Sequence, residues 1–97
     1  MRIISKRTLR AFWIRYPDAE AALSAWYREV EKEDWEKPAQ VKARYRSASF
    51  LKDNRVVFNI KGNTYRLIVK INYEYGVIYV RFVGTHAEYD KVDATEV

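Results

Sequence analysis

The chain has 97 residues, of which 48% are hydrophobic, and a formal net charge of +5. This length suits one domain, residues 1–97, built around a single core. The absence of cysteine excludes disulfides, thiolate metal sites and thiol nucleophiles. With one histidine in the chain, a zinc site would have to rest on carboxylates, against the usual preference of that metal. We therefore expect no metal and no cofactor.

The N-terminal residues are basic, but no apolar run of signal-peptide length follows them. No segment approaches the roughly 20 apolar residues that a membrane-spanning helix needs. The sequence therefore predicts a soluble, cytoplasmic protein that does not enter a membrane.

The first predicted elements are a brief strand at residues 3–4 and a helix that follows it. Ser5 or Thr8 is expected to cap this helix, which runs to about Tyr16. Pro17 ends it, because the residue before a proline is disfavoured in the helical conformation. The apolar positions recur with the spacing of one helical face: they are Leu9, Phe12, Trp13 and Tyr16.

A second amphipathic helix is predicted from Asp18, a good N-cap residue, to about Lys32. The two helices, joined at one proline, read as a helical hairpin. Pro38 is then expected at the first position of a short third helix that reaches Arg44 or Tyr45. Apolar residues of the second helix form one stripe: Ala19, Ala22, Leu23, Trp26, Tyr27 and Val30.

The second half of the chain predicts an antiparallel meander after an unpatterned loop at residues 47–54. The strands are expected at residues 56–61, 64–71 and 77–83, with turns at 62–63 and 74–76. Alternation places one set of apolar residues on a common face: Val56, Phe58, Ile60, Tyr65, Leu67, Val69, Ile71, Ile78, Val80 and Phe82. That face must be covered. We predict an α+β fold, in which an N-terminal helical hairpin packs on a small antiparallel sheet.

The positive charge is concentrated in the strand region. Residues 37–81 contain ten basic and two acidic residues, a local balance of +8, whereas residues 18–36 have a balance of −5. A surface of this kind attracts polyanions through counterion release and long-range steering. The strand region therefore favours a nucleic acid as the partner.

Polar groups at strand positions and strand ends indicate what this surface does to RNA. Arg66 and Arg81 can hold a phosphate and stabilise charge in a transition state. His86 or Tyr89 can transfer protons, and RNA carries its own nucleophile in the 2′-hydroxyl. This combination predicts cleavage of RNA without a metal. Further contacts to RNA or to the ribosome are expected from Asn59, Lys61, Asn63 and Lys70.

Each of these residues, taken alone, has an ordinary structural explanation. An arginine on a sheet is commonly solvated or ion-paired. A histidine near a strand end commonly has a structural role. The Gly62-Asn63 pair is explained as a hairpin turn. The alternative function is therefore a non-catalytic RNA- or DNA-binding module that uses the same basic sheet. That alternative explains the charge but not the cluster at residues 85–89.

Two segments closely resemble a known family. FNIKGNTYRL (residues 58–67) and RFVGTHAEYD (residues 81–90) are similar to the HigB-type toxins of bacterial toxin–antitoxin modules, in the RelE superfamily of mRNA interferases. The opening MRIIS, the YP at residues 16–17, the WY at 26–27 and the WxxP at 35–38 fit the same pattern in order. The resemblance covers nearly the whole chain.

The resemblance implies a RelE-like fold and a toxin that cuts translated mRNA, commonly on the ribosome and without a metal. It also implies a HigA-like antitoxin with a helix-turn-helix domain, and a toxin–antitoxin complex that binds operator DNA. Arg66 and Arg81 resemble the superfamily's phosphate-binding arginines, and Tyr89 its C-terminal catalytic tyrosine. The proton donor and acceptor stay open between His86, Tyr89 and a lysine such as Lys61. Any C-terminal helix is expected to be absent or very short.

Overall fold

The computed structural model describes all residues, 1–97, and has one five-stranded sheet. The strands are β1 (Arg2–Ile4), β2 (Ser49–Leu51), β3 (Arg55–Ile60), β4 (Tyr65–Asn72) and β5 (Val77–Thr85), in the spatial order β1-β5-β4-β3-β2. Neighbouring strands are antiparallel, except that β1 runs parallel to β5. The predicted α+β fold is confirmed, and the predicted meander is its centre.

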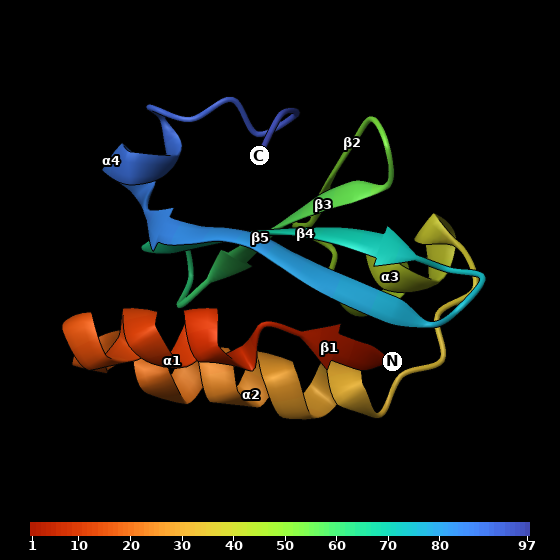
Figure 1. Cartoon of the computed structure of the whole chain (residues 1–97), viewed down its shortest axis with the longest axis horizontal. Coiled ribbons are helices and arrows are strands. Elements are labelled where there is room, and N and C mark those ends of the chain that lie inside the picture. The colour runs from red at the N-terminus through yellow and green to blue at the C-terminus, as the bar shows by residue number, and fades with distance from the viewer.

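The helices are α1 (Lys6–Arg15), a 3₁₀ turn η1 (Pro17–Ala19), α2 (Glu20–Glu31), α3 (Pro38–Arg44) and the one-turn α4 (His86–Tyr89). Figure 1 shows α1 and α2 side by side along one face of the sheet, with α4 and the C-terminal segment on the other. No helix is long and apolar enough to pass through a bilayer.

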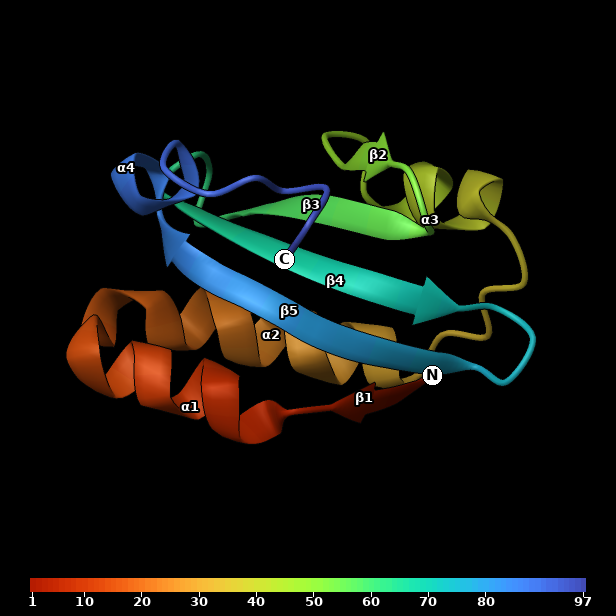
Figure 2. The same cartoon turned by 45° about the horizontal axis from the view of Figure 1, so that its top comes forward.

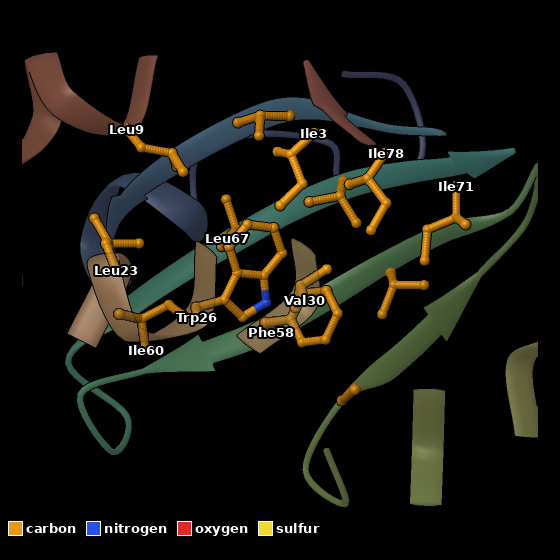
Figure 3. Packing of buried hydrophobic residues seen from close by; sticks show 14 of the residues in the cluster. Ile3, Leu9, Leu23, Trp26, Val30, Phe58, Ile60, Leu67, Ile71 and Ile78 are labelled. Carbon is orange, nitrogen blue, oxygen red and sulfur yellow. The ribbon is translucent and has the colours of Figure 1, made fainter. Parts of the chain in front are cut away.

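The main core lies between the sheet and the helices, and 19 buried residues form it. Trp26 of α2 is at its centre, with its ring centroid 5.4 Å from that of Phe58 on β3 (Figure 3). Leu67 and Ile78 bring β4 and β5 into the same cluster. Tyr45, directly after α3, meets the ring of Phe58 edge to face. The alternation that predicted this face is confirmed through β3 and β4.

The predicted helix starts were wrong in their capping. Ser5 does occupy the N-cap of α1, but in a left-handed conformation and without a side-chain capping bond. Asp18 lies within η1, and α2 begins after Ala19. The carboxylate of Asp18 instead accepts hydrogen bonds from Lys61 and Tyr65. A long-range ion pair has thus taken the place of a local cap.

The stretch predicted as a loop at residues 47–54 contains β2, which pairs with β3 at the edge of the sheet. Three residues form this strand, and Phe50 on it is exposed. Such a short edge strand has too few positions to show alternation. The loop prediction was therefore wrong at its centre.

A β-bulge interrupts β5 and changes which residues face the helices. Val80 lies opposite Val69, but the next pair is Phe82 opposite Ile68, so Arg81 is the extra residue. A bulge of this kind shifts the alternation by one position. The prediction that Phe82 shares the face of Val80 was wrong. Val83 packs on the helix-side core in its place.

The face of the sheet turned away from α1 and α2 is called here the open face. Val57 and Ile68 on this face are fully buried, yet neither belongs to the helix-side core. The C-terminal tail, residues 90–97, returns from α4 across this side of the sheet (Figure 2). Nε of Arg55 donates a hydrogen bond to the carbonyl oxygen of Val97 at 2.9 Å. The tail therefore covers the middle of the open face and leaves two polar regions beside it.

Candidate functional site: an arginine-centred site on the open face

The first polar region is built around Arg66 of β4. Asn59 lies directly opposite on β3, and its Oδ1 accepts a hydrogen bond from a terminal guanidinium nitrogen of Arg66 at 2.7 Å. The guanidinium carbon lies 5.3 Å from the ring centroid of Tyr89, a cation–π contact. Nε of Arg66 is buried without a hydrogen-bond partner. Two fixed contacts thus hold an arginine that keeps an unused donor.

A capping box fixes the helix that carries Tyr89. Thr85 Oγ1 accepts from the backbone N–H of Glu88 at 3.1 Å, and Glu88 Oε1 accepts from that of Thr85 at 2.9 Å. Arg15 of α1 lies 3.4 Å from the other oxygen of Glu88. The Thr85 N–H, more than Arg15, holds the pKa of the Glu88 carboxyl below its usual value. These contacts orient a helix of one turn that would be unstable alone.

His86 is the first residue of α4, one turn from Tyr89. Its backbone N–H donates to the carbonyl of Thr64, which ties α4 to the start of β4. Nδ1 lies 3.2 Å from a carboxylate oxygen of Asp90, and the side chain is 47% exposed. Since Asp90 faces Nδ1, Nε2 is the nitrogen available to a substrate. The structure thus brings His86, Tyr89 and Arg66 to the same end of the open face.

Gly84 lies opposite Arg66 in the sheet and is buried. A Cβ added to it would lie 2.5 Å from the ring of Phe82 and 3.2 Å from Cβ of Glu88. The missing side chain therefore lets the Phe82 ring lie over the strand while α4 approaches it. The bulge makes this possible, because it turns Phe82 to the open face.

The second polar region lies further along the same face, around Lys70 and Arg81. Lys70 and Arg66 share the face of β4 four residues apart, which corresponds to roughly 13 Å. Lys70 pairs in register with Tyr79, and Arg81 follows on β5. A hollow with a volume of about 630 Å³ opens here. The two arginines predicted to act together thus share a face but line different parts of it.

Two of the predicted RNA-binding residues lie outside both regions. Lys61 and Asn63 are in the turn between β3 and β4, and both side chains are exposed. Lys61 Nζ lies 2.8 Å from an Asp18 oxygen, toward the helices and away from Arg66. Asp18 also accepts from the Tyr65 hydroxyl, and this bond raises the pKa of Tyr65 to about 12. The structure therefore does not bring Lys61 to the arginine-centred site.

Sequence reasoning missed the residues that position the site. Arg15 is far from Glu88 in the sequence, and no periodicity connects them. Arg55 is almost buried and holds the tail, with Asp53 3.5 Å from its guanidinium. In the sequence, only the position of Arg55 at the start of an apolar strand indicates that it is buried, and this indication is weak. Nowhere do three or more histidine or carboxylate side chains gather closely enough to hold a metal ion.

Comparisons with known proteins identify the family of the chain. A model of the HigB toxin family, described as a RelE-like toxic component of a toxin–antitoxin system, matches residues 19–92. The mRNA interferase toxin HigB of Escherichia coli strain K12 is 33% identical over 92 residues, covering 93% of this chain and 88% of that protein. The mRNA interferase HigB of Escherichia coli O6:H1 is 30% identical over 94 residues, covering 95% and 91%. The resemblance and the RelE-like fold expected from the sequence are confirmed: this chain belongs to the HigB family of RelE-like toxins from toxin–antitoxin systems.

Proposed function

We propose that this protein is an mRNA interferase, a metal-independent endoribonuclease that cuts translated mRNA on the ribosome. One observation carries the proposal: Arg66 is held by Asn59 and Tyr89 while its buried Nε has no partner. An unsatisfied buried donor costs about 1–3 kcal/mol and calls for an explanation, which a phosphate bound at this guanidinium would supply. Two relatives that align over nearly the whole chain carry the name mRNA interferase, which supports the same function.

In the proposed reaction the RNA 2′-hydroxyl attacks the adjacent phosphorus. A base takes the hydroxyl proton, the bond from phosphorus to O5′ breaks, and an acid gives a proton to O5′. The products are a 2′,3′-cyclic phosphate and a 5′-hydroxyl. Arg66 binds the scissile phosphate and stabilises its developing charge, and Arg81, further along the open face, supplies a second phosphate contact. His86 and Tyr89 are the acid–base pair, since Lys61 is engaged with Asp18.

The partners follow from membership of the family and from charge. A toxic component of a toxin–antitoxin system implies an antitoxin, and we propose a HigA-like, helix-turn-helix protein whose complex with this toxin binds operator DNA. Action on translated mRNA places the protein in the cytoplasm. Asn59 and Lys70 on the strands, with Lys61 and Asn63 on the turn between β3 and β4, are proposed as contacts to mRNA or the ribosome.

Induced expression with mapping of mRNA 5′ ends tests the function. Growth arrest with discrete cuts in translated frames is the expected result. Arrest without cuts would favour the alternative, a non-catalytic nucleic-acid-binding module. A downstream reading frame for a helix-turn-helix protein would support the antitoxin. Filter binding to ribosomes should weaken steeply as salt is raised, because residues 37–81 carry a balance of +8.

A further inference from the structure

The largest hollow of the molecule lies on the open face, away from Arg66. Its volume is about 630 Å³, and its polar lining includes Asn54, Asn72, Lys70 and Arg81. Ile71 and two tyrosines, Tyr73 and Tyr79, complete the walls, and Glu74 is the single acidic residue of the lining. The function proposed above uses Arg81 for phosphate chemistry and Lys70 as a contact to mRNA or the ribosome, and it leaves the other lining residues without a role.

The lining combines the three groups that hold single-stranded nucleic acid. Tyr79 is 39% exposed on the sheet surface, so part of this aromatic side chain is accessible to a base. Lys70 lies opposite it in register, where an ammonium can meet a phosphate. The amides of Asn54 and Asn72 can form hydrogen bonds with the edge of a base. Aromatic, cationic and amide groups thus meet within one cavity.

The hollow is firmly built. The Ile71 N–H donates to the carbonyl of Asn54 at 3.0 Å, which joins the β2–β3 turn to the end of β4. Asn72 Oδ1 accepts from the Tyr75 N–H at 3.0 Å. That bond fixes the Asn72 amide and leaves its NH₂ group as a free donor. The Asn72 amide and the backbone around the hollow are therefore held in place before any ligand arrives.

We propose that this hollow receives a base of the mRNA that flanks the scissile phosphate, with Tyr79 as its stacking platform. The inference rests on the proposed function and adds the place where the substrate is held. Arg81 lines the hollow and lies between the levels of Lys70 and Arg66 in the sheet, so one strand of RNA can pass along the open face from the hollow to Arg66. Roughly 13 Å separate the two regions, which requires an extended strand rather than a single nucleotide.

Binding of a short single-stranded 2′-O-methyl oligonucleotide, which lacks the nucleophile, tests the hollow without cleavage. Tyr79→Ala should weaken binding by about tenfold or more, as loss of a stacking aromatic does. Tyr79→Phe keeps the ring and should bind like the unmodified protein. Tyr75→Ala is the matched control, because Tyr75 is 74% exposed and lies outside the hollow. Each variant is checked for unchanged unfolding.

Unchanged affinity of Tyr79→Ala, an equal loss in Tyr75→Ala, or no saturable binding by the unmodified protein would overturn the proposal. So would adenosine monophosphate binding as tightly as the oligonucleotide, since that result describes a mononucleotide site. The outcome is independent of cleavage. Weakened binding by Tyr79→Ala in a protein that makes no cuts supports the hollow and rejects the interferase function. Normal binding by Tyr79→Ala in a protein that cuts mRNA rejects the hollow as a base-binding site and supports the interferase function.

Discussion

The two faces of the sheet are stabilised in different ways, although the same strands form both. The helix-covered face is a continuous apolar cluster to which α1, α2 and α3 contribute. The open face has a small apolar centre under the tail, and its outer parts are held by specific polar contacts such as Asn59 with Arg66. Apolar packing tolerates volume-conserving changes, whereas a polar network depends on every partner. Stability and activity should therefore respond to different substitutions.

The largest expected effect on the open face comes from the acid–base pair. His86→Gln keeps a polar side chain but cannot exchange a proton near neutral pH, so cleavage should fall by about 10²–10⁴. The cleavage rate is measured in single-turnover experiments with a ribosome-bound mRNA. Tyr89→Phe, which removes one hydroxyl, is the comparison. Near-normal cleavage by His86→Gln with a large defect in Tyr89→Phe would assign the main role to Tyr89.

On the helix-covered face, the expected effect is on folding. Leu67 is fully buried in the core, and Leu67→Ala should lower the free energy of unfolding by about 2–5 kcal/mol. Urea denaturation measures the change. The control is Lys70→Ala, an exposed position on the same strand, which should stay within about 0.5 kcal/mol. Equal losses from both variants would mean that the two faces do not differ as described.

Arg66 is the sequence neighbour of Leu67 and points to the opposite face. Arg66→Ala should reduce cleavage by about 10²–10³, the usual cost of removing one donor to developing charge. Arg66→Lys should rescue poorly, because an ammonium cannot reproduce the bidentate fork. Arg81→Ala is expected to reduce cleavage to a similar extent as Arg66→Ala. Full toxicity of soluble, folded Arg66→Ala protein in the growth assay would place the phosphate site elsewhere.

The smallest effect concerns pH and the capping box of α4. The folded-state pKa of Glu88 is lowered from its ordinary value of 4.5, chiefly by the Thr85 N–H. A lowered pKa means that this stabilisation is present above pH 4.5 and is lost as pH falls through the folded-state value. Between about pH 6 and 3, the free energy of unfolding should therefore fall more steeply for the unmodified protein than for Glu88→Gln, as measured by denaturation curves at each pH. If the free energy of unfolding falls equally with pH in the two proteins, Glu88 does not contribute to the loss of stability in acid.

The sequence predicted the fold where periodicity was long, as in β4, whose alternating residues all take the expected faces through Ile71. It could not predict β2, because three residues at an edge carry no period. It also assigned Asp18 to a local cap, since its ion pair with Lys61 depends on the folded arrangement of distant segments. Polar contacts between distant segments leave no pattern in the local sequence from which they could be predicted.

The candidate site was predicted in part for the same reason. Asn59 and Arg66 lie on adjacent strands joined by a short turn, so their meeting followed from the hairpin itself. Tyr89 reaches Arg66 only because α4 folds back, which depends on Thr85 and Glu88. The roles assigned to these side chains stay predictions until the substitutions are made.

The bulge at Arg81 has a consequence for how this strand can vary. One additional residue sets the phase of everything that follows it on β5, including the approach to α4. A single insertion between Phe82 and Gly84, with the bulge kept, would turn Gly84 toward the helices and bring its neighbours to the open face. An insertion in this segment should therefore abolish activity even though no functional side chain is lost.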